Sequence, residues 1–260
     1  MTTEEDQTKK RRLQIKSYKS PEEMAAYAAS RIVEALGSSD NPSLCVATGE
    51  SPKRVYSNLA ARHQNEGWDT SRLTIIKLDE WYPMRMDDAA SCEVFLQQRV
   101  IQPLQIDPSM YISFDGSAHD AKKECLAIDD RLDRLGGIDV CVLGLGTNGH
   151  VGLNEPGDHL ELRSHRAEIS ATTMLHPMIS GKTVHSGLTL GMRDLLTAKR
   201  IILLVSGQGK GETVRSLFSG RITTLVPASL LLLHSDIDIL CDSEVLPSLD
   251  EELAKLARRL

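Results

Sequence analysis

The 260-residue sequence predicts an α/β fold with a mainly parallel sheet between two layers of helices, a three-layer α/β/α sandwich. Short runs of Val, Ile and Leu alternate along the chain with longer segments of helical periodicity. These runs are apolar on both faces of a strand, as in parallel sheets that helices cover on both sides. No linker-like segment or change in composition divides the chain. We therefore expect a single domain at 13–260, preceded by a flexible polar head at 1–12.

The first predicted helix has clear start and stop signals. Ser20 is a capping residue, Pro21 takes the first helical position, and Glu23 completes a capping box. Apolar residues then follow at helical spacing until Gly37, which is a common helix terminator.

The other predicted elements alternate in type along the chain. They are strands 43–48, 73–78, 111–114, 138–145, 200–206 and 236–241, and helices 51–63, 92–104, 121–135 and 249–260. Ligands of parallel α/β folds bind beyond the carboxyl ends of the strands. The loops that follow strands 43–48, 73–78, 138–145 and 200–206 should therefore converge on one site.

Composition excludes several classes of protein. A net charge of -6 argues against a nucleic-acid partner. The five cysteines are scattered and form no CxxC pair, which favours buried thiols in a reducing compartment over disulfides or a zinc site. The charged N-terminus is unlike a signal peptide, and the apolar runs are too short to span a membrane. We expect a cytoplasmic protein with no nucleic-acid or membrane partner.

Two of the strand ends carry groups suited to a phosphate. After strand 43–48, Gly49 allows a close turn, and Ser51 opens a helix whose free N–H groups can hold an anion. After strand 200–206, Lys210 stands in the first turn of a helix. A plain capped helix and a solvated lysine remain the alternative interpretations.

The other two strand ends carry proton-handling groups. Asp79 and Glu80 follow an apolar strand, where a carboxylate is costly unless it is partnered or functional. The third end reads VLGLGTNGHVGLNEPG, in which three glycines predict a tight turn and His150 is followed by Glu155. A capping Asp with a solvated Glu, and a structural histidine, are the alternatives. No GxSxG nucleophile motif is present.

Taken together, ATGESP, KLDEW, GLGTNGHVGLNEPG and SGQGK resemble the amino-sugar-6-phosphate deaminase/isomerase family over about residues 13–242. KLDEW, CEVFLQQRVIQPL and the glycine-rich motif are most similar to its galactosamine-6-phosphate branch. The resemblance implies a modified Rossmann-like fold and a reaction without cofactor or metal. The partner would be a small sugar phosphate. The amino-sugar epimer, a homo-oligomeric state and allosteric control stay open.

The resemblance also implies a role for each matched residue. Sugar ring opening precedes proton transfer between C2 and C1, and ammonia leaves to give a ketose 6-phosphate. Asp79 would transfer the proton, while His150 would open the ring with help from Glu155. The phosphate would be held by Thr48, Gly49, Ser51 and Lys210.

The sequence departs from the family pattern at two places. Asn148 stands where glucosamine-6-phosphate deaminases carry an aspartate of the ring-opening relay; the galactosamine branch also has Asn there. A phosphate-binding arginine of the deaminases has no counterpart between residues 167 and 191. His176, Lys182 or His185 could replace it.

Two other functions compete with this interpretation. A 6-phosphogluconolactonase would share the fold and the GxxGH histidine, but usually reads DER in place of DEW and lacks the NEP glutamate. A non-catalytic phosphosugar sensor would carry a helix-turn-helix domain, for which the 12-residue head is too short.

Overall fold

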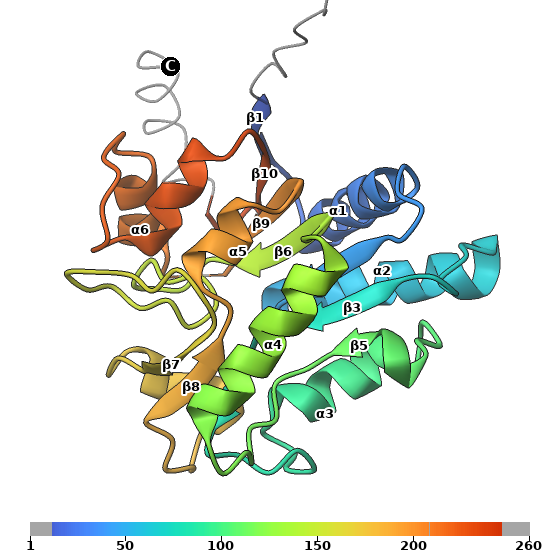
Figure 1. The fold of residues 1–260 in the computed structure, drawn as a ribbon. Helices are drawn as coiled ribbons and strands as arrows, with labels where there is room; N and C mark the ends of the chain where they lie inside the picture. Colours follow the sequence, from blue (N-terminus) through green and yellow to red (C-terminus); the bar gives the residue numbers. More distant parts are fainter. Residues whose placement is uncertain (1–11, 208, 246–260) are drawn as a thin grey trace, which may run out of the picture.

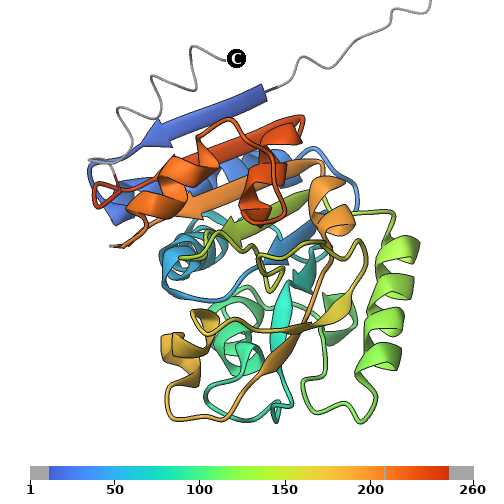
Figure 2. The same ribbon diagram turned by 90° about the vertical axis from the view of Figure 1, so that its left-hand side faces the viewer.

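A seven-stranded parallel sheet forms the centre of the computed structural model, which describes residues 12–207 and 209–245 (Figure 1). Its strands lie in the order β1 (Arg12–Ser17), β10 (Asp236–Cys241), β9 (Arg200–Val205), β6 (Val140–Gly144), β2 (Ser43–Val46), β3 (Thr74–Lys77) and β5 (Tyr111–Ile112). Every neighbouring pair is parallel, which confirms the predicted sheet. Strand β1 was not predicted; it pairs with β10 at the sheet edge (Figure 2).

Helices cover both faces of this sheet, which confirms the three-layer arrangement. One face packs against α1 (Pro21–Leu36), α2 (Glu50–Glu66) and α3 (Cys92–Leu96) with its π-helical continuation Gln97–Ile101. The other packs against α4 (Ala121–Leu135), α5 (Met192–Leu196), α6 (Gly211–Leu217) and the 3-10 helix Pro227–Leu233. Side chains of β6 alternate between the layers: Val140 and Val142 join the first core, Cys141 and Leu143 the second.

A second, antiparallel sheet was not predicted. It consists of β4 (Asp79–Tyr82), β8 (Ser186–Thr189) and β7 (His165–Glu168), in that order. Short 3-10 helices at Thr173–Leu175 and Pro177–Ile179 lie between β7 and β8, and another at Pro108–Met110 precedes β5. A small apolar core that includes Trp81, Leu153 and Ile169 supports this region. Asp79 therefore begins a strand rather than a strand-end loop.

Local details confirm some of the predicted helix boundaries and correct others. Ser20 accepts a hydrogen bond from the Glu23 N–H, as predicted for the start of α1. Ser51 is not a cap, because α2 begins at Glu50 and its N-cap is Gly49, whose φ of 112° suits glycine. The predicted helix 249–260 lies outside the described residues. Within the described part of the chain, no helix has the length and apolar character needed to cross a membrane.

Candidate active site

The four predicted strand ends meet at one cavity of about 580 Å³. The loops after β2, β3, β6 and β9 all contribute to its lining, as expected for the carboxyl edge of a parallel sheet. Six of the predicted site residues line it directly: Thr48, Gly49, Ser51, Asp79, His150 and Lys210. Asn148 and Glu155 do not line the cavity but are linked to His150.

The loop between β2 and α2 forms one part of the cavity wall. Because Gly49 caps α2 without a side-chain hydrogen bond, the N–H groups of the first helical turn are not satisfied by a capping side chain. The Ser51 hydroxyl contacts the hydroxyl of Ser206 at the end of β9. Thr48 Oγ1 lies 3.4 Å from the Sγ atom of Cys92. Hydroxyl and N–H groups at a helix N-terminus are typical of an anion site.

Lys210 lies directly before α6 and lines the same cavity. Its Nζ atom donates to the Leu145 carbonyl oxygen at 2.6 Å, which anchors the side chain to the end of β6. Burial lowers the pKa of Lys210 to about 8, against a smaller opposing effect of Asp242. The buried Lys210 ammonium group therefore has little nearby negative charge in the free protein. A bound anion such as phosphate would supply that charge and stabilise the protonated lysine.

Asp79 lies on the first residue of β4 and is buried. Its Oδ1 atom has the Cys92 thiol at 3.9 Å as a weak donor. Burial raises the pKa of Asp79 to about 7; the Glu80 carboxylate adds to the rise, and Lys77 and Cys92 oppose it. A carboxylate whose pKa lies near neutrality can both accept and return a proton at physiological pH.

Glu80 is neither solvated nor available for proton transfer. It is fully buried, and its carboxylate accepts from Lys77 Nζ and from three backbone N–H groups. Of the two carboxylates after β3, only Asp79 faces the cavity.

The loop after β6 brings His150 to the cavity through close packing on glycine. A Cβ atom on Gly146 would overlap the His150 ring, so no larger residue fits there in this arrangement. Gly149 has a φ of 91° and provides the turn. Gly144 has no positive φ, and a Cβ atom at that position would meet nothing within 4 Å, so the turn does not require it.

The ring of His150 contacts a group of polar side chains. Its Nδ1 atom lies 3.7 Å from Glu155 Oε2 and 3.3 Å from Thr173 Oγ1, and Thr173 also donates to Glu155. Asn148 donates to Glu155 at 2.7 Å, while its side-chain carbonyl oxygen accepts from the backbone N–H of His150 at 3.1 Å. The Asn148 side chain thus links the Glu155 carboxylate to the backbone of the loop that carries His150. Burial lowers the pKa of His150, although Glu155 opposes this, so the ring is neutral at neutral pH.

The three candidates for the missing arginine differ in position. His176 lines the cavity, and burial together with Lys210 lowers its pKa. Its ring lies 5.7 Å from that of Trp81. Lys182 instead pairs with Asp88 at 2.6 Å, and neither Lys182 nor His185 belongs to the cavity lining.

Several cavity residues were not predicted. Cys92, Thr173 and Trp81 lie beside the predicted groups because α3, the 170–179 segment and β4 pack together around the small sheet. Among the described residues, no group of three or more His, Cys, Asp or Glu side chains is arranged to hold a metal ion.

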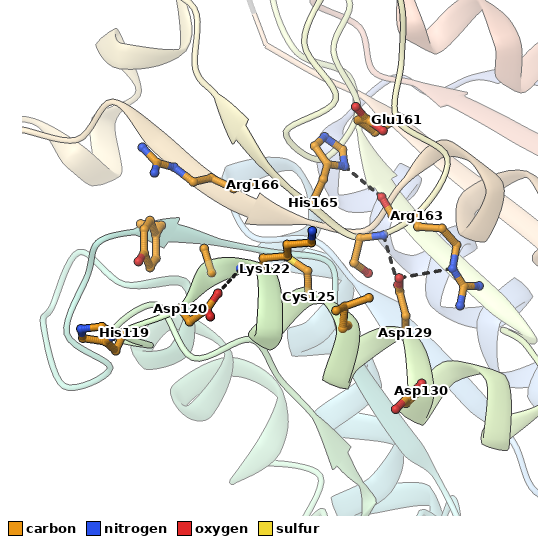
Figure 3. A pocket seen from close by; sticks show the side chains of 14 residues that line it. His119, Asp120, Lys122, Cys125, Asp129, Asp130, Glu161, Arg163, His165 and Arg166 are labelled. Carbon is orange, nitrogen blue, oxygen red and sulfur yellow. Dashed lines mark hydrogen bonds and ion pairs between the residues drawn. The ribbon is translucent and has the colours of Figure 1, made fainter.

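A second cavity, of about 790 Å³, lies between α4 and β7 (Figure 3). It contains none of the predicted site residues. Its buried Asp129 already contacts Arg163 at 3.2 Å and accepts from the Ser164 N–H at 3.1 Å. We therefore place the candidate active site in the smaller cavity, where strand ends, unpaired charge and shifted pKa values coincide.

A parallel α/β sheet whose carboxyl edge holds a buried carboxylate, a neutral imidazole and a helix N-terminus is typical of enzymes that act on small phosphorylated molecules. The chain belongs to the glucosamine-6-phosphate isomerase/6-phosphogluconolactonase family, whose sequence profile matches residues 18–239.

Individual relatives cover most of the chain. "Putative deaminase AgaI" of Escherichia coli K12 is 39% identical over 211 residues, which is 80% of this chain and 84% of that protein. Glucosamine-6-phosphate deaminase 1 of Bacillus subtilis 168 is 35% identical over 228 residues, 86% of this chain and 94% of that one.

Solved structures show the same fold. A monomeric glucosamine-6-phosphate deaminase of the NagB superfamily matches with a TM-score of 0.85 and 33% identity, covering 90% of this chain and 99% of its own. 6-Phosphogluconolactonase from Trypanosoma brucei matches with a TM-score of 0.74 but only 21% identity, which shows the shared fold alone.

Proposed function

We propose that the protein is an amino-sugar-6-phosphate deaminase/isomerase that converts galactosamine-6-phosphate or glucosamine-6-phosphate to a ketose 6-phosphate and ammonia. The main support is the convergence of Asp79, His150, the α2 N-terminus and Lys210 on one cavity. The curated relatives with deaminase names support the same activity.

The first step is opening of the sugar ring. His150 is neutral, so it can take the proton of the anomeric hydroxyl and return one to the ring oxygen. Glu155 stabilises the imidazolium that forms in between, and Asn148 and Thr173 hold Glu155 in place. Asn148 is neutral, unlike the aspartate of glucosamine-6-phosphate deaminases at this position, and it donates a hydrogen bond to Glu155. We therefore assign to Glu155 the carboxylate that assists His150 in this relay.

The second step is isomerisation. Asp79 removes the C2 proton of the open aldose and delivers a proton to C1, while a proton passes from the amine to O1, so that the aldehyde becomes a hydroxyl and the C2–N bond becomes an imine. Water then adds to C2 and ammonia leaves, which gives the ketose. The raised pKa of Asp79, about 7, supports its assignment as the base.

The phosphate end of the substrate remains unchanged during both steps. We assign its binding to Thr48, Gly49, Ser51 and Lys210, and we favour His176 over Lys182 and His185 as a further donor because it lines the cavity. The reaction needs no cofactor or metal in this scheme.

Further expectations belong to the same proposal. The five cysteines are all free and buried, which supports a reducing compartment such as the cytoplasm. Residues 13–260 act as one domain, since strands of both sheets supply cavity residues. The KLDEW and CEVFLQQRVIQPL segments and Asn148 favour the galactosamine epimer.

A substrate panel tests the activity. The protein is mixed separately with glucosamine-, galactosamine- and N-acetylated 6-phosphates and with 6-phosphogluconolactone, and ammonia and ketose 6-phosphate are measured. Equal yields of ammonia and ketose 6-phosphate from an amino-sugar 6-phosphate that is not acetylated support the proposal. Turnover of the lactone alone would indicate a lactonase, and binding without turnover would indicate a sensor.

A further inference from the structure

The chain passes from the large sheet to the small one immediately before Asp79. Strand β3 ends at Lys77 and β4 begins at Asp79, so Leu78 alone separates the two strands. The two sheets contain different sets of strands. The position of the Asp79 carboxylate therefore depends on how this junction is held.

A buried ionic cluster spans the junction. The Nζ atom of Lys77 lies 2.8 Å from Glu80 Oε2 and 2.9 Å from Glu93 Oε2, and the side chains of Lys77 and Glu80 are fully buried. Glu93 also accepts from the hydroxyls of Tyr111 at 3.0 Å and Ser113 at 2.8 Å. The cluster thus joins the end of β3, strand β4, helix α3 and the β5 region.

Glu80 fixes β4 to the start of α3. Its carboxylate accepts from the N–H groups of Trp81, Cys92 and Glu93, each at 2.9 Å. Cys92 in turn places its thiol beside Asp79. Since neighbouring residues of a strand point to opposite faces, Glu80 holds the strand from the side away from the cavity.

Burying these charges is costly, and a buried ion pair often adds little to stability compared with apolar packing. Neither Lys77 nor Glu80 lines the cavity, so contact with a ligand does not explain why two charged side chains are buried here. We propose that the Lys77–Glu80 pair is a positioning device that holds Asp79 at the cavity across the junction between the two sheets, an inference that rests on the proposed role of Asp79.

The charges near Asp79 agree with this role. Glu80 raises the pKa of Asp79, while Lys77 and the Cys92 thiol lower it. Cys45 on β2 and Tyr56 on α2 also interact electrostatically with Asp79, and burial raises the pKa of both groups, so both are neutral. Lys77 and Glu80 are therefore the two charged groups that act on the Asp79 carboxyl.

The test compares Glu80→Gln with a matched control, Asp238→Asn. Asp238 forms a buried ion pair of the same kind with Arg31, between α1 and β10, outside the cavity lining. In Glu80→Gln we expect kcat to fall up to about 100-fold, as for a misplaced catalytic group. KM should change by less than about threefold, because substrate contacts remain. Asp238→Asn should lower Tm while kcat stays near the wild-type value.

Infrared difference titration of the Asp79 carboxyl, identified with Asp79→Asn, gives a readout independent of turnover. Removal of the Glu80 charge should move the Asp79 titration to lower pH, and Lys77→Met should move it to higher pH. If Lys77→Met does not fold, the shift of the Asp79 titration in Glu80→Gln is sufficient to test the inference. An unmoved titration, or a loss of kcat that Asp238→Asn reproduces, would overturn the inference. Undiminished turnover in Asp79→Asn would instead contradict the proposed base.

Discussion

Asp79 and His150 contribute to the same cavity but lie in different surroundings. Asp79 has a thiol at 3.9 Å as its hydrogen-bond partner, whereas His150 is part of a polar group with Glu155 and Thr173. Burial raises the pKa of Asp79 and lowers that of His150. Burial shifts the two pKa values in opposite directions because the carboxyl is charged when it loses a proton and the imidazole when it gains one.

This difference would allow Asp79 and His150 to act as two proton carriers at the same pH, as the proposed mechanism requires. The carboxyl becomes a base near neutrality, and the imidazole stays neutral and free to accept a proton. The two residues also differ in their support: we infer that the Lys77–Glu80 pair holds Asp79 from the opposite side of its strand, whereas the partners of His150 contact its ring directly. Variants at the two residues should therefore fail in different ways.

The largest effect is expected for Asp79→Asn. The amide keeps the size of the side chain but cannot act as a base, so turnover should fall about 10²–10⁴-fold. Binding of the sugar phosphate should survive. Wild-type turnover in deuterium oxide should place deuterium at C1 of the ketose, to the extent that Asp79 exchanges with solvent. Near-normal turnover in the variant would show that another group is the base.

His150→Gln should cause a smaller and conditional loss. Without the imidazole, ring opening becomes slow for the cyclic substrate, while the chemistry at C1 and C2 is untouched. An analogue that lacks both the 4- and the 5-hydroxyl can close neither a furanose nor a pyranose ring, so the variant should process it at a rate closer to that of wild type. An equal loss with both compounds would place His150 in the isomerisation step instead.

Much of the architecture could be predicted because local patterns were enough. Six of the seven strands of the large sheet lie in the predicted apolar segments, and the order of strands and helices implied which ends would meet; β1, which reads RLQIKS, lacks such a run and was not predicted. The small sheet could not be predicted in this way. Strands β7 and β8 read HRAE and SGLT, which lack such a run, and β4 pairs with β8 across more than a hundred residues, from Asp79 to Thr189.

The site was predictable where its groups follow strands directly, as with Asp79, His150 and Lys210. Cys92 and Thr173 escaped prediction because their place depends on the packing of α3 and the 170–179 segment against the small sheet. The prediction of Ser51 as a cap is wrong because the N-cap is Gly49, two residues earlier, and the helix begins at Glu50. The buried Glu80 cluster likewise depends on Lys77 and Glu93, which only the folded chain brings together.

Lys210→Ala tests a group that belongs to neither proton carrier. The phosphate does not change during the reaction, so Lys210 should contribute the same binding energy to substrate and transition state. Loss of one charged hydrogen bond, about 1.5–3 kcal/mol, should raise KM on the order of 10- to 100-fold with little change in kcat. An unchanged KM would remove Lys210 from the phosphate site.

The smallest expected change is the pH dependence within about one unit of the optimum. Asp79 must be ionised to act as a base, so kcat/KM should rise as pH increases through about 7. Lys210 must be charged to bind phosphate, so kcat/KM should fall as pH increases through about 8. A narrow bell-shaped profile between these values follows. Lys210→Ala should lose the alkaline limb and keep the acid limb, which separates the lysine from ionisation of the substrate amine. If both limbs persist in that variant, the alkaline limb reports ionisation of the substrate and not of Lys210. The role of Lys210 in phosphate binding would then rest on the change in KM alone.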